Sequence, residues 1–316
     1  AVYGSRASNG VVVIETVAPK AGKFNITYNL TGTITAPDLS SYDYFDAAEK
    51  LEVEKLAGYY EINPPNKGIR QVYSELIKKQ MALAKGVNTD WLALPLRVGY
   101  NHKHSVAIDG GNDNIRYGIN LFYDQQKGVM KKDLRSRLGT ELRIDYRLSN
   151  LNVINRISFN KVLAKNSPYG TFSDYVNQLP YNELYDEFGN YLYNFNTWHS
   201  GSIYVNPMYE GAETKNFGKT TTEEFSDNLL IDWYLNEHLN IKAQIGFTRT
   251  TTSGKNFTDP ASGKYFSGSD DTPKGSLSTS EGKAFDWTTN LQVLYNRSIG
   301  VNHISGSIGI NTTEKY

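Results

Sequence analysis

The first residues whose types and spacing suggest chemistry are His102 and His104. In an extended segment, residues two positions apart place their side chains on the same face of the strand. Two imidazoles arranged in this way could bind a metal such as zinc, which takes three or four protein ligands. No third ligand follows nearby, and Val98 and Tyr100 share the same face. We therefore expect an apolar strand face there and no metal site.

Pairs of acidic residues form a second group that could do chemistry. Asp43 with Asp46, and Asp270 with Asp271, could be imagined as acid–base pairs, although such catalysis needs geometry as well as residue type. All four fall in segments that we expect to be surface loops, where carboxylates are solvated. Residues 109–114 read DGGNDN but lack the spacing and the closing Glu of an EF-hand. The sequence predicts no catalytic residue, no cofactor and a protein that is not an enzyme.

Aromatic residues crowd one long segment, 163–222, that shows no strand pattern over most of its length. Rings beside Asn and Asp side chains suit stacking on sugar rings or holding peptides. The candidate substrate-binding residues are Tyr169, Phe172, Tyr175, Tyr181, Tyr185 and Trp198. The alternative is that these rings pack the segment onto its neighbours and onto a partner protein.

The composition narrows the class of protein. The 316 residues carry a formal net charge of zero, which gives no support to nucleic-acid binding. The chain has 23 Tyr, against 3 Met, and no cysteine. It contains no run of about 18 apolar residues that would predict a transmembrane helix. The opening AVYGSRASNG lacks the features of a signal peptide, so we expect a processed chain or an internal fragment.

A strict alternation of apolar and polar residues organises most of the chain. In residues 115–124, IRYGINLFYD, the odd positions are apolar and the even positions are mostly polar, as in a strand with two different faces. The same pattern predicts nine strands, near residues 24–31, 96–109, 115–124, 138–148, 151–162, 223–235, 239–251, 284–296 and 302–311. Their length of about ten residues matches a tilted membrane-spanning strand. The polar face suits a wet lumen, so we predict an all-β, transmembrane antiparallel β-barrel over a soluble sheet with one solvated face.

The links between these strands alternate between short and long. Short links follow residues 109, 148, 235 and 296, whereas long links cover about 36–95, 128–137, 163–222 and 252–283. Outer-membrane barrels have short periplasmic turns and longer extracellular loops, so all the long links would lie outside the cell. The link 36–95 is expected to be helical, with one helix from Ser40 or Ser41 to about Tyr60 and another from Lys67 to Lys85.

The opening segment carries the most specific pattern. YGSRASNGVVVIET has a turn at Asn9-Gly10 and a Val-rich stretch that is apolar on both faces, which predicts a strand buried on both sides. It resembles the end of the plug domain in the SusC/RagA family of TonB-linked outer-membrane proteins. The matching residues are Tyr3, Gly4, Ser5, Arg6, Asn9 and Gly10. Further along, residues 88–130, SPYGTFSDY at 167–175 and residues 206–233 resemble the family in the same order.

This resemblance implies a fold and a function. Such importers are 22-stranded barrels with a plugged lumen, so residues 1–21 would end the plug and residues 22–316 would begin the barrel. The implied activity is TonB-dependent import of nutrients, either glycans and oligosaccharides or peptides, across the outer membrane of a Gram-negative cell. The implied partners are a SusD-like surface lipoprotein as a lid, outer-membrane lipid, and TonB through a segment that this chain lacks. A passive porin or adhesin-type barrel and a soluble carbohydrate-binding β protein are the alternatives.

Overall fold

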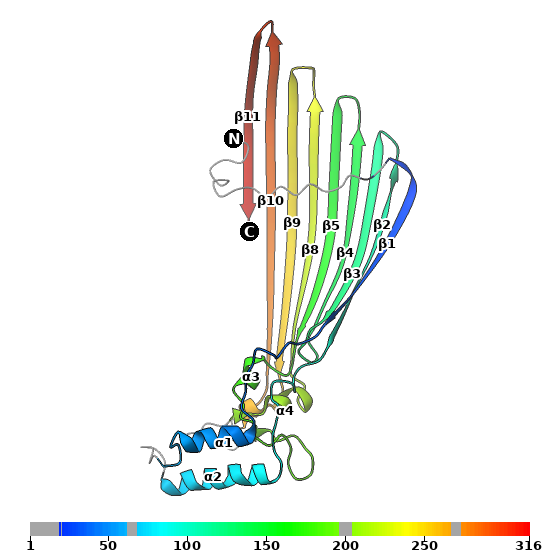
Figure 1. The fold of residues 1–316 in the computed structure, drawn as a ribbon. Coiled ribbons are helices and arrows are strands. Elements are labelled where there is room, and N and C mark those ends of the chain that lie inside the picture. Colours follow the sequence, from blue (N-terminus) through cyan, green and yellow to red (C-terminus); the bar gives the residue numbers. More distant parts are fainter. Residues whose placement is uncertain (1–18, 20, 62–67, 196–203, 267–272) are drawn as a thin grey trace.

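Nine long strands form one antiparallel sheet, in the order β1-β2-β3-β4-β5-β8-β9-β10-β11 (Figure 1). The structure is a computed structural model that describes residues 19, 21–61, 68–195, 204–266 and 273–316. The strands are β1 (Gly22–Thr35), β2 (Gly99–Gly111), β3 (Ile115–Lys127), β4 (Leu134–Arg147), β5 (Leu151–Asn166), β8 (Phe217–Tyr234), β9 (Leu239–Thr258), β10 (Ser276–Ile299) and β11 (Asn302–Lys315). The predicted all-β class and its nine strands are confirmed.

The two faces of this sheet differ as the alternation predicted. On β4, Ile144 and Tyr146 are exposed, whereas Arg143 and Asp145, which alternate with them, are buried. Directly paired residues of neighbouring strands share a face, so the apolar side chains of adjacent strands gather on one face. Asn155 and Asp227 interrupt this face and form a hydrogen bond of 2.6 Å with each other. Pro19 lies against the opposite, polar face, where a Cβ on Gly118 would come within 3.2 Å of its ring. The polar face is therefore the one that contacts the chain just before β1, as expected for the inner face of a barrel.

Short turns join the strands at one end of the sheet. Asn112 accepts hydrogen bonds from the backbone N–H groups of Asn114 and Ile115 through its side chain. Asn236 repeats this arrangement with the N–H groups of His238 and Leu239. Such side-chain turns let the chain reverse within a few residues, and all four predicted short links are confirmed.

The link after β3 is shorter than the predicted 128–137, because β4 already begins at Leu134. Gln125 pairs with Ser136, and Lys127 pairs with Leu134. Alternation marks a strand only where its two faces meet different solvents. The sequence pattern therefore ended before the strands did.

Two helices occupy the long link between β1 and β2. Helix α1 (Ala47–Leu56) begins after Asp46, whose side chain accepts from the backbone N–H of Glu49, while the Glu49 side chain accepts from the N–H of Asp46. This capping box lies several residues beyond Ser40 and Ser41, so the predicted start of the first helix is wrong. Helix α2 (Ile69–Ala84) falls within the predicted second helix. No helix in the described ranges is both long and apolar enough to span a membrane.

The long links gather at one end of the sheet (Figure 1), and we call them the loop cap. The cap comprises the links between β1 and β2, β5 and β8, and β9 and β10. It also contains helices α3 (Ser173–Val176) and α4 (Pro207–Ala212), the 3₁₀ helix η2 (Gly263–Tyr265), and the paired strands β6 (Asn194–Phe195) and β7 (Tyr204–Val205). The Trp91 indole donates to Leu179 O at 3.0 Å, and Thr89 N donates to Pro180 O at 2.8 Å. These two hydrogen bonds join the β1–β2 link to the β5–β8 link.

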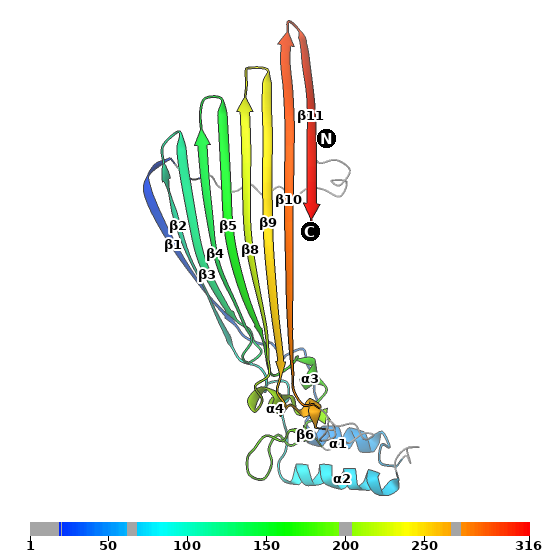
Figure 2. The ribbon, with the colours of Figure 1, turned by 180° about the vertical axis from the view of Figure 1, so that it is seen from behind.

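The described part of the sheet is open at both edges. β1 pairs with β2 alone, and β11 pairs with β10 alone. The view from behind shows the same order, with β1 and β11 at opposite sides of the sheet (Figure 2). The strands form a curved wall with a loop cap at one end.

Candidate functional site

Two of the six predicted binding residues, Tyr169 and Tyr175, belong to one buried hydrophobic cluster of the loop cap. Tyr175 is fully buried, and its hydroxyl donates to Tyr169 O at 2.8 Å. Tyr169 is itself buried and packs with Tyr175, Trp91, Phe195 and Met208. Burial raises the pKa of both phenols. These two rings therefore pack their segment onto its neighbours, which is the alternative that the sequence analysis left open. Their contact with a substrate stays a prediction.

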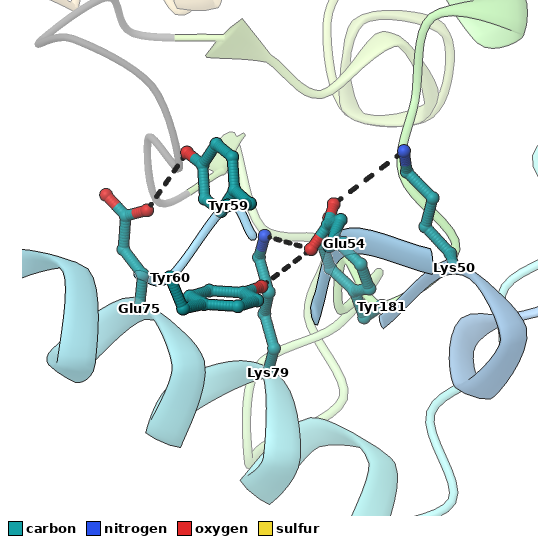
Figure 3. A network of polar contacts seen from close by, with 7 residues as sticks. All are labelled: Lys50, Glu54, Tyr59, Tyr60, Glu75, Lys79 and Tyr181. Carbon is teal, nitrogen blue, oxygen red and sulfur yellow. Dashed lines mark hydrogen bonds and ion pairs between the residues drawn. The ribbon is translucent and has the colours of Figure 1, made fainter. Parts of the chain in front are cut away.

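A third predicted residue, Tyr181, belongs to a polar network between α1, α2 and the β5–β8 link (Figure 3). Glu54 is at its centre. It accepts from the hydroxyls of Tyr60 and Tyr181 at 2.6 Å each, and from Lys79 Nζ at 2.8 Å. Lys79 is fully buried, and its ammonium group lies 4.6 Å from the centre of the Tyr181 ring. Tyr181 therefore fixes its segment to both helices.

Opposing effects set the charge states in this network. Burial would raise the pKa of Glu54, but the hydrogen bonds from Lys79, Tyr181 and Tyr60 outweigh it, so its pKa is lowered. Burial lowers the pKa of Lys79, and Glu54 opposes this. Burial together with Glu75 raises the pKa of Tyr59 to about 12. The network therefore holds a carboxylate against neutral phenols, which suits fixing the cap.

The remaining predicted rings are more accessible. Phe172 is half-buried and lies edge-on to Tyr42, with ring centres 5.7 Å apart. Tyr185 is 44% exposed, and its ring centre is 4.7 Å from that of Tyr191. The two hydroxyls share a hydrogen bond of 3.2 Å, and this bond together with burial raises the pKa of Tyr191 to about 12. These rings can reach a ligand without moving the packed part of the cap. Trp198 lies outside the described residues.

A cavity of about 450 Å³ opens between the β5–β8 link and the β9–β10 link. Its wall includes Tyr169 and a set of polar side chains, which are Asp174, Asn177, Gln178, Glu210, Asn216 and Lys264. Amides, carboxylates, an ammonium group and an aromatic ring are groups that orient small polar ligands. The cavity suits the binding of a polar substrate group rather than its chemical conversion.

Glu210 holds the two links that line the cavity together. Its carboxylate accepts from Ser262 Oγ at 2.8 Å and from the backbone N–H of Gly263 at 2.7 Å. The sequence analysis missed the polar residues of this cavity, because they come from two distant links without periodicity. Asn206 followed by Pro207 is a helix-start signal that would have marked α4.

The histidine pair lies as the strand parity predicted, on the apolar face of β2. The ring centres of His102 and His104 are 5.1 Å apart, and His104 Nδ1 shares a hydrogen bond of 2.7 Å with the Tyr28 hydroxyl. Among the described residues, no group of three or more His, Cys, Asp or Glu side chains gathers as a metal site would require. Asp270 and Asp271 lie outside the described residues, as do the six residues of the opening pattern, Tyr3, Gly4, Ser5, Arg6, Asn9 and Gly10.

Comparison with known proteins gives relatives in sequence. No protein-family model matches the chain. TonB-dependent receptor P26 of Formosa agariphila is 26% identical over 237 residues, which is 74% of this chain and 22% of the relative. TonB-dependent receptor SusC of Bacteroides thetaiotaomicron is 29% identical over 133 residues, which is 42% of this chain and 11% of the relative. The chain thus spans about a fifth of the length of these relatives, or less.

Solved structures show the same fold. The RagAB peptide importer in its "closed-closed" state superposes with a TM-score of 0.77, covering 99% of this chain and 37% of that chain at 18% identity. The RagAB peptide transporter gives a TM-score of 0.76. The resemblance to SusC/RagA proteins is therefore confirmed. Receptors of this kind are outer-membrane proteins of Gram-negative bacteria, which confirms the expected location, and they are transporters rather than enzymes.

Proposed function

We propose that this chain, a homologue of TonB-dependent receptors of the SusC/RagA kind, forms part of the wall and the external cap of an importer. The importer would take up oligosaccharides or peptides across the outer membrane, with energy transmitted through TonB. The observation that carries the proposal is the two-faced wall with its packed cap at one end. An apolar outer face suits lipid and a polar inner face suits a wet lumen. Residues 1–21 would be the end of the plug that closes this lumen.

The cavity between the β5–β8 link and the β9–β10 link supports binding of a polar substrate at the external side. Asn177 and Lys264 both line it and come from different links. We expect Asn177→Ala and Lys264→Ala to weaken substrate binding, because each removes a hydrogen-bond donor. Lys255→Ala is the matched control, since Lys255 is exposed on β9 and does not line this cavity. Equal affinities for all three variants would contradict this site.

The outer face of α2 supports a protein partner of the SusD-like lipoprotein kind. Ile69, Tyr73, Ile77 and Met81 are each more than half exposed, and four-residue spacing puts them on one side of the helix. The opposite side of the same helix buries Glu75 and Lys79. A helix that exposes its apolar side chains and buries charged ones is completed by a partner that covers the apolar stripe.

Paired variants of α2 test the partner. Ile77→Asp places a charge in the stripe, whereas Gln71→Asp places the same charge on an exposed position away from the stripe. We expect Ile77→Asp to reduce co-purification of the lipoprotein encoded beside the receptor, and Gln71→Asp to leave it unchanged. Unchanged co-purification in both would remove the support that α2 gives to a lid.

Gene deletion tests the function as a whole. A strain that lacks the full-length protein should lose growth on one class of oligosaccharide or peptide, and loss of TonB should have the same effect. Recovery of the full-length protein in the soluble periplasmic fraction would contradict a membrane wall. Growth that is lost without the protein but kept without TonB would favour a passive porin instead.

A further inference from the structure

The apolar face of the sheet carries a line of aromatic rings on the side of the loop cap. Phe225, Phe247 and Phe285 lie on β8, β9 and β10, with neighbouring ring centres 5.8 and 6.1 Å apart. Phe159 of β5 is directly opposite Phe225. Outer-membrane barrels have such girdles of aromatic residues where the lipid tails meet the headgroups. These four rings, which we call the aromatic girdle, therefore mark the end of the hydrocarbon layer nearest the loop cap.

Four lysines form a row on the same face, between the aromatic girdle and the loop cap. Lys165 is directly opposite Lys219, and Lys219 is directly opposite Lys255. Lys127 continues the row on β3, separated from Lys165 by Leu134 of β4. The four lysines are exposed, and we call them the lysine row. Like charges directly opposite each other across strands destabilise a sheet, so the row needs a compensating negative charge.

The carboxylates of this face already have other partners. From the girdle to the loop cap, the strands carry three of them on this face, which are Glu223, Glu281 and Glu314. Glu223 pairs with Lys161 at 2.7 Å, and Glu281 pairs with Lys283 at 2.9 Å. Glu314 accepts hydrogen bonds from an indole and a phenol. Among the described residues, no carboxylate forms an ion pair with a member of the lysine row.

The same part of the face therefore has a surplus of positive charge. Besides the lysine row it carries Lys161, Arg249 and Lys283, so seven cations meet three carboxylates. Arg249 lies at the girdle itself, directly opposite both Phe225 and Phe285. A face that is apolar on one side of the girdle and basic on the other is complementary to an anionic lipid, whose tails and headgroup divide at the same level.

The height of the lysine row indicates the kind of lipid. Lys219 is six residues beyond Phe225, which is about 20 Å along the strand and about 14 Å along the membrane normal at a tilt of about 45°. The headgroup layer of a bilayer is about 5–8 Å thick on each side. The phosphate of a phospholipid therefore reaches Arg249 but not the lysine row. A glycolipid whose saccharide carries phosphates reaches both.

We propose that the lysine row and Arg249 form a binding site for a glycolipid of the outer leaflet that carries phosphates on its saccharide. The ammonium groups bind these phosphates as point charges, which removes the repulsion between the opposed lysines. The acyl chains lie along the apolar face on the other side of the girdle, over Ile231 and Ile245. The inference rests on the lipid-facing wall of the proposed function, but not on import.

Lysine acetylation of the full-length receptor tests the occupant. Receptor in phosphatidylglycerol liposomes is compared with receptor in the same liposomes containing rough-type lipopolysaccharide, which has a phosphorylated saccharide. We expect the lipopolysaccharide to lower the acetylation of Lys165 and Lys219 about tenfold and to leave that of Lys55, exposed on α1, unchanged. Equal acetylation with and without lipopolysaccharide, or equal protection by lipopolysaccharide stripped of its phosphates, would overturn the proposal.

Paired charge variants test the row itself. Lys165→Gln with Lys219→Gln removes two charges from the row. Lys103→Gln with Lys242→Gln removes two exposed lysines from the polar face, where each is directly opposite an aspartate. Native mass spectrometry of the full-length receptor with rough-type lipopolysaccharide measures binding. We expect the first pair to lower the affinity about tenfold and the second to leave it unchanged, and equal affinities for the two pairs would overturn the proposal.

Thermal unfolding separates the missing counter-charge from a loss of folding. In detergent without glycolipid, Lys219→Gln should raise the unfolding temperature of the full-length receptor, because it removes the central like charge of the row. A lower unfolding temperature would show that contacts within the protein hold this lysine, and would overturn the proposal. None of these readouts depends on transport, so a receptor that binds lipopolysaccharide as expected but imports nothing would refute import alone.

Discussion

At the scale of single residues, Gly139 in the middle of β4 occupies a position where a side chain would collide with a neighbouring ring. A Cβ on Gly139 would lie 2.3 Å from the Phe122 ring. Phe122 is the one large apolar side chain on the polar face of β3, and Arg137 lies 4.9 Å from its centre. The ring thus lies between the backbone of β4 and a guanidinium group. The fit depends on the absence of a side chain at position 139.

We expect Gly139→Ala to destabilise the full-length protein by about 1–3 kcal/mol, the usual cost of overpacking. Thermal unfolding in detergent would measure the change. Gly282→Ala on β10 is the control, because a Cβ there meets nothing within 4 Å. Equal unfolding temperatures for the two variants would show that Phe122 can move aside at no cost.

The Glu54 network predicts a response to acid. The pKa of Glu54 is lowered by its partners, so the carboxylate stabilises the folded cap above its unfolded pKa of 4.5, and this contribution is lost as the pH falls through the lower folded value. Hydrogen exchange of α1 and α2, corrected for its intrinsic pH dependence, should therefore rise below about pH 4.5. Glu54→Gln should raise exchange at neutral pH and lose the pH response.

The exposed Glu52 provides the comparison for this variant. Glu52 pairs with Lys55 at 3.4 Å on the surface of α1, where ion pairs contribute about 0–1 kcal/mol. Glu52→Gln should keep the acid response of the native protein. Breaking the buried contact by Glu54→Gln should cost about 3 kcal/mol, because Lys79 stays buried with a weaker partner. Identical exchange in both variants would mean that the network does not hold the cap.

At the scale of elements, the start of α1 is decided by one side chain. Asp46→Ala removes the cap of α1 and should reduce the stability of the loop cap by about 1 kcal/mol, measured by protease cleavage within residues 47–56. Ser40→Ala should have no such effect, although Ser40 and Ser41 were the two predicted starts of this helix. Faster cleavage in Ser40→Ala than in Asp46→Ala would contradict the observed capping box.

The wall was more predictable from sequence than the cap, for a physical reason. Each strand of the wall meets two different solvents, so its residues alternate and its place in the chain is visible, as Ile115, Tyr117 and Ile119 illustrate. The cap is held by contacts between distant links, such as Lys79 with Tyr181, and no local pattern encodes them. The sequence therefore singled out the aromatic residues of one long link without separating buried Tyr175 from exposed Tyr185.

At the scale of the whole molecule, the open edges limit what the chain can do alone. Single-chain bacterial barrels have an even number of strands, and an unpaired edge is costly in lipid. We expect residues 22–316 expressed alone to aggregate or associate through β1 and β11, and to form no discrete channels in planar bilayers. Monodisperse particles of this piece with a uniform conductance would contradict an incomplete wall.

The length of β10 has a consequence for how the receptor meets its surroundings. Its 24 residues extend about 80 Å at roughly 3.4 Å each. Tilted by about 45°, they rise about 55 Å, whereas the hydrocarbon layer is about 30 Å thick. The stretch SLSTSEGKA at its cap end is almost wholly polar, so this part of the strand stands outside the lipid. In the proposed importer, the entrance would therefore stand above the headgroups and would meet molecules of the surrounding medium rather than those adsorbed to the cell surface.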